Sequence, residues 1–243
     1  MIGLPFIELH SVDSTNNYAM GLVHAGMAQN GTAVFAHEQT RGKGQRKKQW
    51  LSSANQNVLL SIIIQPFSLA IPKQFLLSMA VAIGVQRFFK THAGEETTIK
   101  WPNDLYWRDR KAGGILIENI VQGNEWKYAI IGIGININQT SFHELSNDAV
   151  SLKQITGKQF NTIDEAKKLI SFVQMELHKL MASPEEISRE YHLILYKWKQ
   201  QQRLKKGNRI FEATIAGVTN EGLLIASHSV DEYFKIGEIE WII

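Results

Sequence analysis

A glycine-rich basic segment is the first part of the sequence with the composition of a ligand site. Between residues 41 and 48 five cations stand without an acidic residue, and glycines alternate with the first of them (Arg41, Gly42, Lys43, Gly44, Arg46, Lys47 and Lys48). Glycine lets the backbone fold closely around an anion, and cations neutralise phosphate or carboxylate groups. The pattern suits a nucleotide or an acyl-adenylate. Taken alone, such a run is more often a solvated basic loop.

A second candidate is the turn after an expected strand at residues 97–101, where Lys100, Asn103 and Asp104 stand together. Seven residues after Asp104 comes Lys111, which is followed closely by a pair of glycines. A lysine placed there can neutralise a carboxylate and an α-phosphate together, as the transition state for adenylation of a carboxylic acid requires. Asp104 is a candidate ligand for Mg²⁺ on a triphosphate. The alternative is a surface turn whose tryptophan packs in the core.

Several other kinds of site are disfavoured by the sequence. It contains neither a G-x-x-x-x-G-K-[ST] loop nor the third glycine of a dinucleotide fingerprint. The absence of cysteine excludes disulfides, thiolate metal sites and cysteine nucleophiles, and the eight histidines show no metal-ligand spacing. Gly132 and Gly134 lie in an apolar run, where glycine marks either a bulge or the close approach of a ligand.

The composition is that of a globular protein with a sizeable core. The chain has 243 residues, of which 44% are hydrophobic and 20% charged, so a large domain with a small appendage is expected. A net charge of +3 is too small to indicate a nucleic-acid partner by itself. Because no apolar run reaches membrane length and the N-terminus lacks a signal-peptide pattern, we expect a cytoplasmic protein without membrane attachment.

The hydrophobic periodicity predicts an α+β fold in two domains, residues 1–204 and 205–243. In the first, strands are expected at 6–12, 31–38, 57–65 and 97–101, a hairpin at 115–121 and 126–137, and helices at 17–28, 73–90, 161–181 and 184–201. In the second, short alternating runs at 209–218, 222–227, 233–235 and 239–243 predict a small β-barrel.

Taken together, the motifs resemble those of biotin protein ligases in order and spacing. They are Asp13-Ser14-Thr15-Asn16, Gln39-Thr40-x-Gly42-x-Gly44-Gln45-Arg46, Trp50, Lys100-Trp101-Pro102-Asn103-Asp104, Lys111-x-Gly113-Gly114-Ile115-Leu116-x-Glu118 and Gly132-x-Gly134-Ile135-Asn136. The resemblance implies a catalytic domain of the biotin/lipoate ligase type, with a mixed or antiparallel sheet and packed helices, and a C-terminal SH3-like barrel. Because no helix-turn-helix segment precedes the motifs, it also implies a monofunctional enzyme that does not bind DNA.

The resemblance further implies a reaction in two steps. Biotin and ATP, with Mg²⁺, would form biotinyl-5′-adenylate, and a lysine of a biotin carboxyl carrier protein or domain would then take the biotin. The implied catalytic residues are Lys111, Arg46 and Lys43. The implied biotin site comprises Ser14, Thr15, Asn16, Gln39, Gly42, Lys43, Gly44, Gln45, Lys111, Gly113, Gly114, Gly132 and Gly134. The implied ATP and adenylate site comprises Arg46, Trp50, Lys100, Asn103, Lys111 and Asn136, with Asp104 at the Mg²⁺.

The basic loop departs from the family pattern at two positions. Arg41 stands where the family usually has a small residue, and Lys47 stands where it usually has glycine. Both substitutions add charge to a segment that must close over a reactive intermediate. We therefore expect unchanged residue roles but altered retention of the adenylate.

Two other functions and one assembly remain as alternatives. A lipoate or octanoate protein ligase shares the fold and the adenylate chemistry, but its arginine- and glycine-rich signature is absent from the sequence. A non-enzymatic nucleic-acid-binding protein would use the basic loop and the barrel. We rank it lower because neither residues 153–168 nor the barrel segment shows a complementary stripe of cations interleaved with aromatic residues. A homodimer through an exposed sheet edge is also compatible with the sequence.

Overall fold

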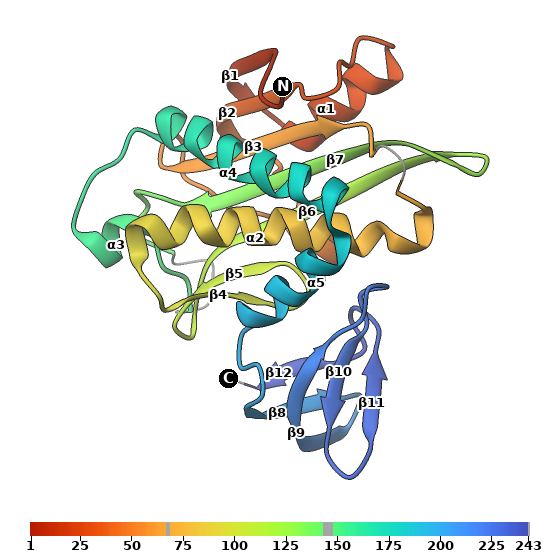
Figure 1. Cartoon of the computed structure of the whole chain (residues 1–243). Coiled ribbons are helices and arrows are strands. Elements are labelled where there is room, and N and C mark those ends of the chain that lie inside the picture. The colour runs from red at the N-terminus through yellow and green to blue at the C-terminus, as the bar shows by residue number, and fades with distance from the viewer. Residues whose placement is uncertain (67–68, 143–147, 243) are drawn as a thin grey trace.

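Two β-sheets joined by a helical segment form the frame of the protein (Figure 1). The computed structural model describes residues 1–66, 69–142 and 148–242. The larger sheet has seven strands in the order β1-β2-β3-β7-β6-β5-β4, and the smaller has five in the order β11-β10-β9-β8-β12. This α+β arrangement confirms the fold class expected from the sequence.

The larger sheet is antiparallel except for the pair β1 and β2. Strand β3, third in this order, is buried at all of its positions, which explains its predominantly apolar sequence. The long β6–β7 hairpin turns at Gly123, whose φ of 59° favours glycine. The strands are β1 (Phe6–Val12), β2 (Ala33–Gln39), β3 (Asn57–Ile64), β4 (Thr97–Lys100), β5 (Asp104–Trp107), β6 (Arg110–Gln122) and β7 (Glu125–Asn136).

Helices cover both faces of this sheet. Those described are α1 (Thr15–His24), α2 (Gln74–Ala93), α3 (Leu152–Thr156), α4 (Thr162–Ala182) and α5 (Pro184–Leu193), with short 3-10 turns at Gln45–Lys47 and Ile71–Lys73. Asn161 caps α4 by accepting hydrogen bonds from the first-turn amides of Ile163 and Asp164. None of the helices in the described part of the chain is long and apolar enough to cross a membrane.

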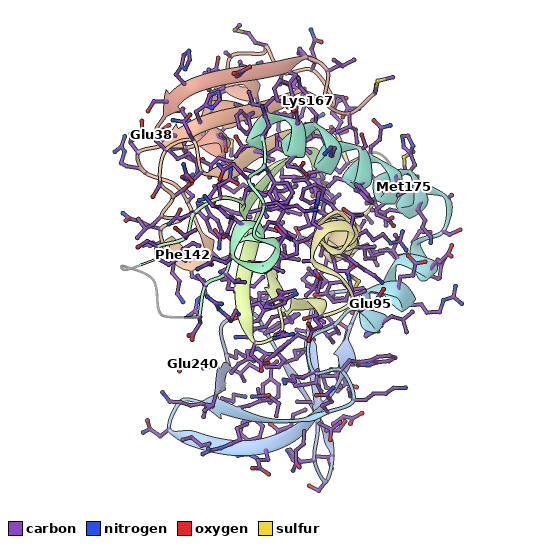
Figure 2. The ribbon with its side chains drawn as sticks, turned by 90° about the vertical axis from the view of Figure 1, so that its left-hand side faces the viewer. Glu38, Glu95, Phe142, Lys167, Met175 and Glu240 are labelled. Atoms are coloured by element: carbon purple, nitrogen blue, oxygen red, sulfur yellow. The ribbon has the colours of Figure 1, made fainter. Side chains whose placement is uncertain are left out.

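Alternate residues of the central strands face different helices. Leu60 of β3 and Ile131 of β7 belong to the main core together with α2 and α4. Ile63 and Ile130, one position out of phase with them, pack instead with Ala19 of α1. Figure 2 looks nearly along α2 and shows side chains filling the space between this helix and the sheet. The face of the sheet that carries α1 is therefore covered over only part of its length by a helix.

The helix expected over residues 184–201 is shorter than predicted and ends at Leu193. Beyond it the chain runs beside β4: Ile99 donates its amide hydrogen to the carbonyl of Ile194, and its own carbonyl accepts from Tyr196, both at 2.8 Å. Lys197 and Lys199 then take φ values of 56° and 58°, which do not continue a right-handed helix. Pairing with β4 replaces the helical hydrogen bonds that the local sequence would favour.

The smaller sheet contains β8 (Gln201–Lys206), β9 (Arg209–Val218), β10 (Leu224–Ser227), β11 (Asp231–Phe234) and β12 (Glu240–Ile242), all antiparallel. It begins at Gln201, before the domain boundary expected from the sequence; the division into domains at 204/205 stays a prediction. Two cations of this sheet lie over aromatic rings: Lys206 is 5.1 Å from the ring of Phe234, and Arg209 is 4.6 Å from that of Phe211.

Candidate active site

A cavity of about 460 Å³ opens on the α1 face of the larger sheet. Its floor is formed by facing residues of β3, β7 and β6, where Leu59 lies opposite Gly134, and Gly134 opposite Gly114. The basic loop after β2 and the strand ends around Lys100 and Lys111 form its walls. The turn between β11 and β12 completes the enclosure, so both sheets contribute to one site.

Most residues expected at the site line this cavity. Only Gly42 and Gly113 of the predicted set do not. Those that do are Ser14, Thr15, Asn16, Gln39, Lys43, Gly44, Gln45, Arg46, Trp50, Lys100, Asn103, Asp104, Lys111, Gly114, Gly132, Gly134 and Asn136.

Gly42 and Gly113 allow close packing next to the cavity. A Cβ atom on Gly42 would overlap the carbonyl oxygen of Trp50, and a Cβ on Gly113 would lie 2.8 Å from the carbonyl oxygen of Gly134. The amide of Trp50 donates to the carbonyl of Gly42 at 2.9 Å, which closes the base of the basic loop. These glycines shape the backbone on which the site is built.

One end of the cavity carries a buried network of hydroxyl and amide groups. The Gln39 side-chain carbonyl accepts from the Thr15 amide at 2.7 Å and from the Thr15 hydroxyl at 3.0 Å. Ser61 of β3 has its hydroxyl 2.7 Å from the Thr15 hydroxyl and 2.6 Å from the Asn16 side-chain oxygen. Because Thr15 and Asn16 begin α1, the helix fixes both side chains over the sheet. Such a network suits a small ligand with both donors and acceptors.

Gly132 and Gly134 make room for other side chains of the protein. A Cβ on Gly132 would overlap the side-chain oxygen of Asn16, and a Cβ on Gly134 would lie 2.6 Å from Cε2 of Trp50. The resemblance implied that these glycines leave space for biotin. In this structure each also admits a neighbour that lines the cavity, Asn16 at one end and Trp50 at the other.

The other end of the cavity is cationic. The Lys111 ammonium lies 2.6 Å from the Asp104 carboxylate and 6.0 Å from the centroid of the Trp50 ring. Lys100 donates to the hydroxyl of Tyr106 at 3.2 Å and lies over the rings of Tyr106 and, across the sheet junction, Trp241. β5 and β6 hold Asp104 and Lys111 next to one another because the two strands pair antiparallel.

Burial lowers the pKa of Lys100 to about 8. The Asp104 carboxylate opposes this shift, and the positive charge of Lys111 adds to it. Burial also raises the pKa of the Tyr106 hydroxyl above its usual range, with Asp104 contributing in the same direction. Tyr106 is therefore neutral at physiological pH, whereas Lys100 is partly deprotonated. An anion arriving at this end would favour the charged ammonium.

The basic loop is folded by its own backbone. The Gly44 amide donates to the Lys48 carbonyl at 2.8 Å, and Lys43 forms a β-bridge with Gln49. Arg46 and Lys47, at the tip, have φ values of 54° and 64°. Glycine adopts this left-handed conformation freely, whereas lysine holds it at a cost in backbone energy.

The turns of the C-terminal sheet pack against Arg46 and Trp101, two residues that line the cavity. A Cβ on Gly237 would lie 2.6 Å from the guanidinium carbon of Arg46, so the loop packs directly on the turn before β12. The Trp101 indole donates to the carbonyl of Gly222 at 3.1 Å and joins the end of β4 to the turn before β10. Figure 1 shows the smaller sheet lying against this end of the larger one.

Two polar residues of the predicted site, Asn103 and Asn136, use their side chains to bind backbone carbonyl groups of the protein. The Asn103 amide donates to the carbonyl of Ile115 at 2.7 Å, and the Asn136 amide donates to that of Val150 at 3.1 Å. Asn136 is almost completely buried. Both side chains fix strand ends at the cavity rim.

Three residues that contribute to the site, Ser61, Glu118 and Trp241, were not assigned a role from the sequence. Ser61 carried a signal, because it is the one polar residue in the otherwise apolar run 58–64 of β3. Glu118 was part of a motif, and the structure pairs its carboxylate with Lys43 and Asn16. Trp241 carried no local signal, since its approach to Lys100 depends on how the two sheets pack.

Magnesium is compatible with this donor set. In proteins Mg²⁺ is commonly held by one or two carboxylates together with substrate phosphates and water. Asp104 offers one carboxylate inside the cavity, with 24% of its side chain exposed. Across the described residues no group of three histidine, cysteine or acidic side chains forms a complete metal cage. The site thus fits an ion that arrives with its nucleotide.

Comparison with known proteins agrees with this geometry. The chain is 28% identical over 231 residues to the bifunctional ligase/repressor BirA of Bacillus spizizenii, covering 93% of this chain and 70% of that protein. It is 29% identical over 142 residues to a biotin–[acetyl-CoA-carboxylase] ligase of Mycobacterium tuberculosis, covering 57% of this chain and 51% of that protein. The chain thus spans about half the length of the second relative.

The fold is also found among solved structures. The biotin protein ligase of Aquifex aeolicus, in complex with biotin and ATP, superposes with a TM-score of 0.80 at 23% identity and covers 98% of both chains. The profile of the Biotin/lipoate A/B protein ligase family matches residues 8–136, just over half of the chain. This match contains every predicted site residue. The chain therefore belongs to the biotin/lipoate A/B protein ligase family.

Proposed function

We propose that this protein is an ATP-dependent biotin protein ligase. The observation that carries the proposal is one cavity with two chemically different ends. A buried hydroxyl and amide network around Thr15, Asn16 and Ser61 suits the donors and acceptors of a ureido ring. The cationic end around Lys111 and Lys100 suits a carboxylate next to a phosphate. The names of the relatives and the bound molecules of the Aquifex structure support the same choice.

In the first step, a biotin carboxylate oxygen bonds to the α-phosphorus of ATP while the bond to the β-phosphate oxygen breaks. Pyrophosphate leaves with that electron pair. Negative charge accumulates on the α-phosphate oxygens, and we assign its stabilisation to Lys111, with Lys43 and Arg46 closing over the intermediate. Trp50 and Asn136 provide the adenine side of the cavity. Mg²⁺ bound with Asp104 would neutralise the triphosphate.

In the second step, the amine of a carrier lysine attacks the carbonyl carbon of the mixed anhydride. An amide forms, AMP leaves, and the amine loses a proton. No enzyme nucleophile is required by this sequence, which agrees with the lack of cysteine. The acceptor that we propose is a biotin carboxyl carrier protein or domain. Exclusion of water by the basic loop would protect the anhydride until the acceptor arrives.

Binding and turnover without an acceptor test the proposal. We expect one equivalent of pyrophosphate per enzyme when biotin and MgATP are added together, and none when either is omitted. The same assay with lipoate in place of biotin tests the alternative substrate, because the dithiolane ring of lipoate lacks the ureido hydrogen-bonding groups. Pyrophosphate release with lipoate and not with biotin would replace this proposal with a lipoate ligase. Salt-dependent binding to duplex DNA with no pyrophosphate release would favour a nucleic-acid-binding protein.

A further inference from the structure

Glu118 of β6 occupies a position between the buried end of the cavity and the basic loop. One of its carboxylate oxygens lies 3.1 Å from the Lys43 ammonium, and the other accepts from the Asn16 amide at 2.8 Å. The Asn16 side chain is almost completely buried against Gly132, whereas Lys43 belongs to the loop. A single carboxylate thus connects the floor of the cavity to the loop that covers it.

The chemistry of a carboxylate determines how Asn16 is oriented. An ionised carboxylate only accepts hydrogen bonds, so the Asn16 nitrogen must face Glu118. The Asn16 oxygen is then left to accept from the hydroxyl of Ser61 at 2.6 Å. Exchange of the amide ends would bring two acceptors together at Glu118. Glu118, together with the Leu116 carbonyl that lies 3.4 Å from the same Asn16 nitrogen, therefore sets the polarity of the buried network.

The ion pair is partly shielded from water. The Glu118 side chain is 28% exposed and that of Lys43 is 40% exposed. The Lys43 backbone is bridged to Gln49, so a tether on the Lys43 ammonium acts on both arms of the loop. Holding the loop at β6 places it over the end of the cavity that contains Asn16.

We propose that Glu118 is a positioning residue that fastens the basic loop to β6 through Lys43 and so slows release of the adenylate. The inference rests on the proposed ligase function. Glu118 does not take part in bond making; it acts through Lys43 and Asn16. Loss of its charge frees the loop while leaving a side chain of the same size.

The test uses a double-mutant cycle on the full-length protein. Enzyme loaded with radiolabelled biotinyl-adenylate is mixed with excess unlabelled biotin, and retained label is followed by filtration. We expect Glu118→Gln to release label about fivefold faster, which is the effect of an ion pair worth about 1 kcal/mol. Lys43→Gln should accelerate release similarly, and the double variant should be no faster than either single variant.

The matched control is Glu125→Gln, which removes the same charge from an exposed pair with Lys127 on the same hairpin. It should release adenylate at the wild-type rate. The proposal is overturned if Glu118→Gln also does so, or if the effects of Glu118→Gln and Lys43→Gln simply multiply in the double variant. If the wild-type enzyme formed no adenylate, the ligase function would be refuted instead. The role of Glu118 would then be tested by comparing the rates at which the wild-type protein and the variants release labelled biotin from the binary complex.

Discussion

Alanine substitutions at Gly134 and Gly132 of β7 are expected to weaken the binding of two different ligands. A Cβ on Gly134 would lie 2.6 Å from Cε2 of Trp50, whereas carbon atoms pack at about 3.5–4.0 Å, so the indole must move by roughly 1 Å. Overpacking of this kind costs about 1–3 kcal/mol. If the whole effect falls on the adenine side, Gly134→Ala weakens nucleotide binding by about 5- to 150-fold.

Gly132→Ala should act at the other end of the cavity. Its Cβ would overlap the side-chain oxygen of Asn16 and disturb the buried network there. We therefore expect weaker biotin binding, again by about 5- to 150-fold, with less effect on nucleotide. Glycine at these positions is needed for close packing and not for a left-handed backbone.

Calorimetric titration of each variant with biotin and with α,β-methylene ATP separates the two effects. Gly21→Ala is the control, because Gly21 lies on the exposed side of α1 and a Cβ there would meet no other part of the protein within 4 Å. It should leave both affinities unchanged and stabilise the helix by up to about 1 kcal/mol. Weaker binding of the same ligand by both glycine variants, or normal binding of the nucleotide analogue by Gly134→Ala, would contradict these assignments.

Three further predictions concern the cationic end and the loop. Lys111→Ala should slow biotin-dependent pyrophosphate release by at least about 10²–10³-fold, and Trp50→Ala should mainly raise the KM for ATP; normal turnover of the lysine variant would rule out its assigned role. Because burial lowers the pKa of Lys100 to about 8, about half of its ammonium is deprotonated at pH 8, and phosphate binding should raise the pKa again. ATP binding at pH 8–9 should therefore take up a fraction of a proton, measured from titrations in buffers of different ionisation enthalpy, and Lys100→Met should abolish this uptake. Lys47→Gly should relieve the left-handed strain of about 1 kcal/mol and change the adenylate release rate, whereas an unchanged rate would show that the loop tip does not control retention.

The fold was predictable where the sequence signal was long and periodic. The expected strand at 6–12 matches β1, and the expected strand at 57–65 matches β3 to within one residue. β5 was taken as part of a turn because four residues are too few to show a period; its pairing with β4 and β6 fixes it. The predicted C-terminal end of α5 was wrong, because the chain there pairs with β4 through hydrogen bonds of Ile194 and Tyr196 to Ile99. This pairing is a long-range interaction that the local sequence does not indicate.

The site residues were predictable where their chemical type and motif indicate a ligand. They were not predictable where their position depends on tertiary packing. Lys111 and Asp104 were expected at one end from their motifs, and the structure brings their charged groups to 2.6 Å. The contact between Arg46 and Gly237 could not be expected, because it depends on how the two sheets pack. The partner of Lys43 depends on strand register, which places Glu118 on the same face as Gly114 and Leu116.

The intact mass of an acceptor domain tests the central proposal most directly. The protein is incubated with biotin, MgATP and a biotin carboxyl carrier domain, and the carrier is measured by mass spectrometry with its modified residue located by peptide mapping. We expect the gain of one biotinyl group on a single carrier lysine, dependent on ATP and lost with Lys111→Ala. An unmodified carrier, or one modified by lipoate in place of biotin, would contradict it.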